Sequence, residues 1–155
     1  MSKKKYIVIA VAVLLVLGLG TWVLARLPFP VDIDQNVQAV IMEDGMNTGT
    51  TNVTITGTRT NYLFSSTQTF VGTFSIQTIS SIQDDDLIAN VVWYHNTQVQ
   101  KITYTQDGSA ISTEVKTDAL VSQDMTEFAL GLTDGTVIAS SETMYHVYMD
   151  AIGNV

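Results

Sequence analysis

"VQKITYTQDGSAISTEVK", residues 99–116, contains two alternating runs of apolar and polar residues joined by Asp107-Gly108. Alternation with a period of two is typical of a strand that buries one face. An Asp-Gly pair between two such runs favours a tight hairpin turn, because both residues tolerate positive φ. The segment therefore predicts an antiparallel β-hairpin.

The same alternation recurs on both sides of this hairpin, in residues 31–41, 51–59, 68–77 and 127–140, the last with Asp134-Gly135 at its turn. Gly72, between two phenylalanines, predicts a bulge, a bend or a close backbone approach. Residues 87–94 are apolar at almost every position, which is typical of a central strand. About seven to nine strands at this spacing predict an antiparallel β-sandwich or barrel-like domain, mainly β in class.

The last segment, residues 140–154, fits either a strand or a short helix. Its larger apolar residues fall on one helical stripe, a serine precedes it, Glu142 suits a first helical turn and Gly153 suits the end. We therefore expect a short C-terminal helix. The stripe contains Met144, Tyr145, Tyr148, Met149 and Ile152.

The N-terminal segment has the length and composition of a membrane span. Residues 6–25 carry no charge, and at about 1.5 Å per residue a helix of this length covers roughly 30 Å, the thickness of the hydrocarbon core. Trp22 suits the outer headgroup region, Arg26 marks the return to water, and prolines at positions 28 and 30 cannot continue the helix. We expect a span over residues 6–27.

Lys3, Lys4 and Lys5 precede this span, and clustered lysines favour the cytoplasmic side. The expected organisation is a cytoplasmic stub (1–5), a signal anchor (6–27), a short linker (28–31) and an extracytoplasmic β domain (32–155). A cleaved signal peptide is the alternative, with cleavage after Ala25 and a secreted domain. The length of the apolar run favours the anchor.

The exported part is strongly acidic. Four of the seven basic residues lie at or before Arg26, whereas all 15 acidic residues follow it, so the remainder carries about 3 − 15 = −12. Such a surface repels phosphate backbones, which makes nucleic acid an improbable partner, and keeps an exported domain soluble. The absence of cysteine from the sequence excludes disulfides, thiol catalysis and attachment of lipid at a cysteine.

Candidate chemical sites receive little support from spacing. Residues 32–43 place oxygen-bearing side chains at several positions of a helix–loop–helix calcium site, but Val37 occupies the position that requires glycine. His95 and His146 are the only histidines, and the residues around them do not have the spacing of a metal-ligand motif. Asp84–Asp86 are interpreted as the solvent-exposed start of a strand. We expect no catalytic residue, no metal and no cofactor. Tyr62, Tyr94 and Tyr148 are the candidates for a ligand-binding aromatic surface.

These observations predict a single-pass, membrane-anchored extracytoplasmic domain that binds a protein or an envelope component without catalysis. The alternative is a small extracytoplasmic hydrolase or metal-dependent enzyme that uses acidic residues with His95 or His146. A cleft with convergent polar groups would favour the enzyme, and an exposed apolar patch would favour binding. The oligomeric state is not indicated by the sequence.

Overall fold

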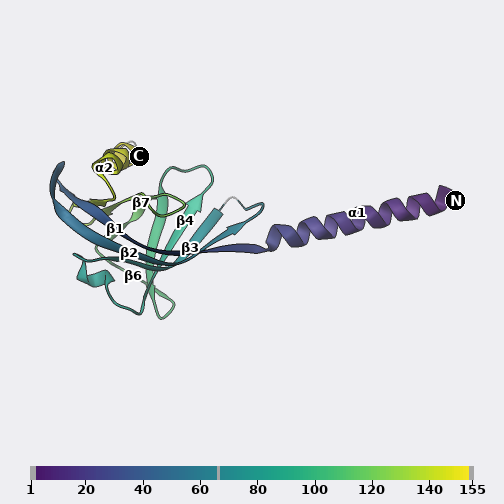
Figure 1. Cartoon of the computed structure of the whole chain (residues 1–155), viewed down its shortest axis with the longest axis horizontal. Helices are drawn as coiled ribbons and strands as arrows, with labels where there is room; N and C mark the ends of the chain where they lie inside the picture. The colour runs from purple at the N-terminus through teal and green to yellow at the C-terminus, as the bar shows by residue number, and fades with distance from the viewer. Residues whose placement is uncertain (1–2, 66, 154–155) are drawn as a thin grey trace.

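The computed structural model describes residues 3–65 and 67–153. A long helix, α1 (Lys3–Arg26), leads into an antiparallel β-barrel, and a second helix, α2 (Glu142–Gly153), ends the chain (Figure 1). The barrel alternative of the predicted fold is therefore the one observed. The strands are β1 (Pro28–Glu43), β2 (Met46–Tyr62), β3 (Thr67–Ile76), β4 (Leu87–Tyr94), β5 (Gln100–Gln106), β6 (Ser109–Ile111), β7 (Val115–Val121), β8 (Phe128–Leu132) and β9 (Val137–Ala139), with a 3₁₀ turn, η1 (Ser80–Ile82).

Eight strands form a closed barrel in the order β4-β3-β2-β1-β9-β8-β7-β5, with β5 pairing back to β4 and β6 beside β5. Every pairing is antiparallel. Closure depends on a short contact between β1 and β9, in which residues 40–42 face residues 137–139. Closure removes most of the unpaired sheet edge that an open sandwich would expose.

The chain leaves α1 and enters β1 at one end of the barrel, which we call the helix-side end. The loops β2–β3, β4–β5 and β7–β8 also lie at this end. The opposite, far end comprises the connections β1–β2, β3–β4, β5–β6 and β8–β9. This alternation follows from the antiparallel order of the strands.

Large apolar side chains fill the barrel interior. Phe74 and Phe128 meet edge to face near the centre, with ring centroids 5.4 Å apart and planes at 81°. Around them pack aliphatic residues from all sides of the barrel. An eight-stranded barrel is just narrow enough for side chains to fill it, so the interior here is a core. Its most deeply buried members are Phe70, Phe74, Phe128, Ile55, Ile76, Ile102, Met125, Leu130, Ile138, Val53 and Val91.

Two glycines allow β2 and β3 to approach closely. Gly57 lies directly opposite Gly72 in the ladder. A Cβ on Gly57 would lie 2.4 Å from the Val71 carbonyl oxygen and 2.7 Å from the Gly72 Cα, and a Cβ on Gly72 would lie 2.3 Å from the Thr56 oxygen. The close backbone approach predicted at Gly72 is thus confirmed.

The β7–β8 loop closes the helix-side end. Met125 adopts a left-handed φ of 60° and is fully buried, so its side chain packs into the core at this end of the barrel. The loop is held by Asp124, whose carboxylate accepts hydrogen bonds from the hydroxyls of Ser122 (2.6 Å) and Thr126 (2.8 Å). These hydrogen bonds stabilise the charged form and lower the pKa of Asp124.

Helix α2 confirms the predicted C-terminal helix and packs on the outer wall of the barrel. The Ser141 hydroxyl caps it by accepting from the Met144 amide at 3.1 Å. Its buried side contacts β1, β7, β8 and β9 through a second apolar cluster. Met149, expected on the buried stripe, is instead exposed, and Val147 and Ala151 pack there.

Two features of the predicted organisation are wrong. Residues 28–31 are not a linker: they begin β1 and pair with residues 59–62 of β2. Strand β4 is not apolar on two buried faces, because its burial alternates along the strand and Ile88 is exposed. It is a barrel strand with one buried face, and its outer face is mostly apolar, with Ile88, Val92 and Tyr94 beside Asn90.

Helix α1 runs from residue 3 to residue 26 with a mean hydropathy of 2.8 in its most apolar window, and none of that window is buried by the rest of the chain. Length and composition therefore suit an N-terminal anchor or signal helix. The Thr21 hydroxyl donates to the Leu17 carbonyl at 2.9 Å, which satisfies it within the helix.

Candidate functional site

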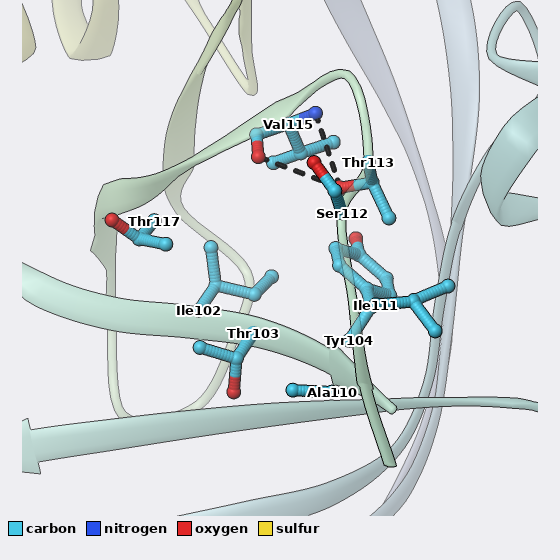
Figure 2. A pocket seen from close by; sticks show the side chains of 9 residues that line it. All are labelled: Ile102, Thr103, Tyr104, Ala110, Ile111, Ser112, Thr113, Val115 and Thr117. Atoms are coloured by element: carbon cyan, nitrogen blue, oxygen red, sulfur yellow. Dashed lines mark hydrogen bonds between the residues drawn. The ribbon is translucent and has the colours of Figure 1, made fainter. Parts of the chain in front are cut away.

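A cleft opens in the barrel wall where β5 changes partner. Strand β5 pairs with β7 at Gln100 and Lys101, and with β6 at residues 104–106. Ile102 and Thr103 lie between these two pairings and line a cavity of about 330 Å³ (Figure 2). We call this cavity the seam cleft. Its other lining residues are Tyr104, Ala110, Ile111, Ser112, Thr113, Val115 and Thr117.

The lining of the seam cleft is aliphatic with threonine and serine hydroxyls around it (Figure 2). The Tyr104 hydroxyl donates to the Phe74 carbonyl at 3.0 Å, and burial raises the pKa of Tyr104 far above its ordinary value. Tyr104 therefore stays neutral and acts in packing. None of the nine lining residues is an acid, a histidine or a lysine. This cleft suits contact with a small apolar group more than proton transfer.

A second, more polar pocket of about 310 Å³ lies at the helix-side end, between the loops β2–β3, β4–β5 and β7–β8. Trp93 forms part of it and donates from its indole nitrogen to the Val121 carbonyl at 2.7 Å. Gln100 accepts from the Val121 amide at 2.8 Å, which ties β5 to β7. Gln68 also lines this pocket, and its Oε1 atom is buried without a hydrogen-bond partner among the described residues.

The two histidines are not brought together. His95 lies exposed in the β4–β5 loop and lines the helix-side pocket, whereas His146 lies exposed on α2, against the ring of Tyr145. Within residues 3–65 and 67–153, no three His, Cys, Asp or Glu side chains gather at a distance that would hold a metal ion.

The acids at the start of β1 belong to a strand. Thr58 and Thr56 of β2 donate across the ladder to Asp32 (3.2 Å) and Asp34 (3.4 Å). Residues 32–43 pair with β2 along their length, with one register shift between Ile41 and Met42, so the segment is extended strand where a calcium loop would coil. Asp84–Asp86 lie exposed immediately before β4, where the Asp84 side chain accepts from the Asp86 amide at 3.3 Å.

Charge is segregated along the barrel. Nine of the 15 acids lie in or beside the far-end turns, and of the three basic residues of the barrel Lys116 lies near them. Glu142 belongs to this group because it accepts from Asn47 beside the β1–β2 turn at 3.0 Å. The far end is therefore the most acidic part of the molecule. Its acids are Glu43, Asp44, Asp84, Asp85, Asp86, Asp107, Glu114, Asp134 and Glu142.

The three tyrosines predicted to form a binding surface differ in their exposure to solvent. Tyr62 and Tyr94 are 36% and 46% exposed, and both lie at the helix-side end, where Tyr94 lines the polar pocket. Tyr148 is only 3% exposed: it packs α2 against β8, with its hydroxyl over Gly131. Burial of Tyr148 raises its pKa. The prediction of a surface role for Tyr148 is therefore corrected to a packing role.

No family model, curated protein or solved structure matches the chain. The geometry of the barrel and its two ends therefore carries the functional proposal. Sequence reasoning missed both pockets. The only local signal for the seam cleft is the polar stretch Ser112–Glu114, which interrupts the alternation between Ile111 and Val115.

Proposed function

We propose that the chain is a single-pass membrane protein whose barrel lies outside the cytoplasm and binds a protein or an envelope component without catalysis. The observation that carries this proposal is the segregation of charge along the barrel. An apolar helix leaves one end, and nine acids gather at the other. With α1 in the bilayer, the acidic end faces away from the membrane.

The junction between helix and barrel supports this arrangement. Only Leu27 separates α1 from β1, and β1 pairs with β2 from its first residue. A junction this short holds the barrel next to the bilayer in a restricted orientation, unlike a flexible linker. A cluster of acids held outward attracts cationic partners and raises their rate of encounter.

The orientation can be tested with single cysteines, since the native chain has none. Ser109→Cys places a thiol at the exposed β5–β6 turn, and we expect a membrane-impermeant maleimide to label it on intact cells. Position 109 is preferable to its neighbour Gly108, whose φ of +77° disfavours a side chain. The control is Ser2→Cys, on the expected cytoplasmic side, which should react only after lysis. Labelling of position 109 only after lysis would contradict the proposed orientation.

Retention of the anchor is read from the same cells. The full-length chain should sediment with membranes and keep residues 1–25. A mature chain that begins at Arg26 in the medium would show that the segment is a cleaved signal peptide.

A further inference from the structure

The helix-side end carries exposed apolar side chains on two neighbouring segments. One is the α1–β1 junction, with Leu27 and Phe29. The other is the β2–β3 turn, with Tyr62, Leu63 and Phe64. Phe64 is 71% exposed, although the barrel buries its other phenylalanines except Phe29. We call these five residues the interfacial patch.

The strand register places the two segments side by side. Pro28 is the direct partner of Tyr62, and Phe29 is the partner of Asn61. Directly paired residues of antiparallel strands have Cα atoms about 4.5–5.5 Å apart. Leu63 and Phe64 follow Tyr62 immediately, so they lie close to the residue where the chain leaves α1. Figure 1 shows the β2–β3 turn on the side of the barrel from which α1 extends.

The end of α1 has the residues of a membrane–water boundary. The Arg26 guanidinium lies 4.2 Å from the centre of the Trp22 ring. Tryptophan prefers the headgroup region, and arginine returns the chain to water. Pro28 lies two residues after Arg26, at most about 7 Å along the chain. The interfacial patch therefore begins at the depth of the lipid headgroups.

Charge opposes contact with lipid less at this end than at the far end. Arg26 and Arg59 lie on the helix side, and nine acids lie at the far end. Four acids lie toward this end: Asp32 and Asp34 accept hydrogen bonds from threonines of β2, and the β7–β8 loop contributes Asp124, which accepts from Ser122 and Thr126, and Glu127. Repulsion from anionic lipid is consequently weakest where the apolar side chains are exposed.

We propose that the β2–β3 turn inserts Leu63 and Phe64 into the outer interfacial layer of the bilayer that holds α1. This second contact would fix the tilt of the barrel, which the short α1–β1 junction restricts but does not set by itself. The inference rests on the proposed membrane anchoring by α1. Its occupant is a lipid surface, and a protein partner at the same patch is an outcome of the test.

The test uses the full-length chain with one engineered cysteine carrying an environment-sensitive nitrobenzoxadiazole dye. The protein is reconstituted into phosphatidylcholine–phosphatidylglycerol vesicles that contain lipids spin-labelled near the headgroup or at mid-chain. The dye is placed at Leu63→Cys, at Val13→Cys within α1, or at Met46→Cys. Met46 is the matched control, because it is an exposed apolar residue (66%) in the turn at the other end of β2.

We expect the dye at position 63 to emit at shorter wavelength than at position 46, and to be quenched by the headgroup-labelled lipid. The dye at position 13 should be quenched by the mid-chain label. If position 13 is not quenched, the anchoring proposal itself fails. If position 13 is quenched but position 63 behaves like position 46, the insertion of the turn is overturned. A shift at position 63 without quenching by either lipid would assign the patch to a protein contact, which also overturns it.

A second variant separates insertion from mere proximity. Phe64→Ser in the position-63 labelled protein removes the most exposed ring of the interfacial patch and should leave the far-UV circular dichroism unchanged, since Phe64 supports no core packing. We expect quenching at position 63 to fall toward the position-46 level. Undiminished quenching in this variant would overturn the role of Phe64 in insertion.

Discussion

Gly57→Ala will prevent the barrel from reaching its native stability, although it adds a single methyl group. The new Cβ would lie 2.4 Å and 2.7 Å from backbone atoms of β3, and 2.9 Å from the Phe70 ring. Backbone atoms in a closed sheet cannot move aside singly, so β2 and β3 must separate or bend. Overpacking of a core typically costs about 1–3 kcal/mol, and we expect a loss at or above the upper limit.

Gly49→Ala is the matched control for this prediction. Gly49 lies in the same strand, but its nearest contact to a new Cβ is the Ile41 Cδ1 atom at 4.0 Å. Because alanine costs less entropy than glycine in a strand, this variant should be unchanged or up to about 1 kcal/mol more stable. The measurement is denaturant unfolding of the full chain in detergent, followed by far-UV circular dichroism. Equal stability of the two variants would contradict the close approach of β2 and β3.

Phe128→Ala is expected to produce the other large loss of stability. Phe128 is fully buried, and its ring meets Phe74 edge to face at the centre of the core. Removal of a buried phenylalanine costs about 3–5 kcal/mol, a large fraction of the total stability of an ordinary domain.

The control for the core variant is Phe64→Ala, which truncates the same residue type where it is exposed. In detergent this change should shift the unfolding midpoint little. A large loss at Phe64, or a small loss at Phe128, would show that the assignment of core and surface is wrong.

The β class could be predicted because alternation is a local property of the sequence. Residues 99–116 illustrate this, since the positive φ values at Asp107 and Gly108 (50° and 77°) are those of the predicted hairpin turn. The choice between sandwich and barrel could not be predicted, because apolar and polar residues alternate in the same way in both folds. Closure of the barrel depends on the pairing of residues 40–42 with residues 137–139, two segments that are distant in the sequence.

The candidate site was predictable only where one residue decides the answer. The alternation through Val37 predicts a strand over this segment, and the structure has β1 there. The surface role predicted for Tyr148 is wrong, because a tyrosine ring suits a binding surface and a helix–sheet contact equally well. Only the position of α2 over β8 distinguishes the two roles. Each pocket is lined by residues from strands and loops that are far apart in the sequence. A short sequence motif therefore cannot predict either pocket.

The proposal that the far end binds a partner is tested most directly by photo-crosslinking in living cells. A photoreactive amino acid at Asp85, in the far-end turn before β4, is compared with one at Val71, which is exposed on the outer wall of β3. We expect a discrete adduct from position 85 that weakens when Asp84 and Asp86 are both changed to Asn, and none from position 71. An adduct confined to position 71, or no adduct from position 85 in cells that contain the folded protein, would contradict it.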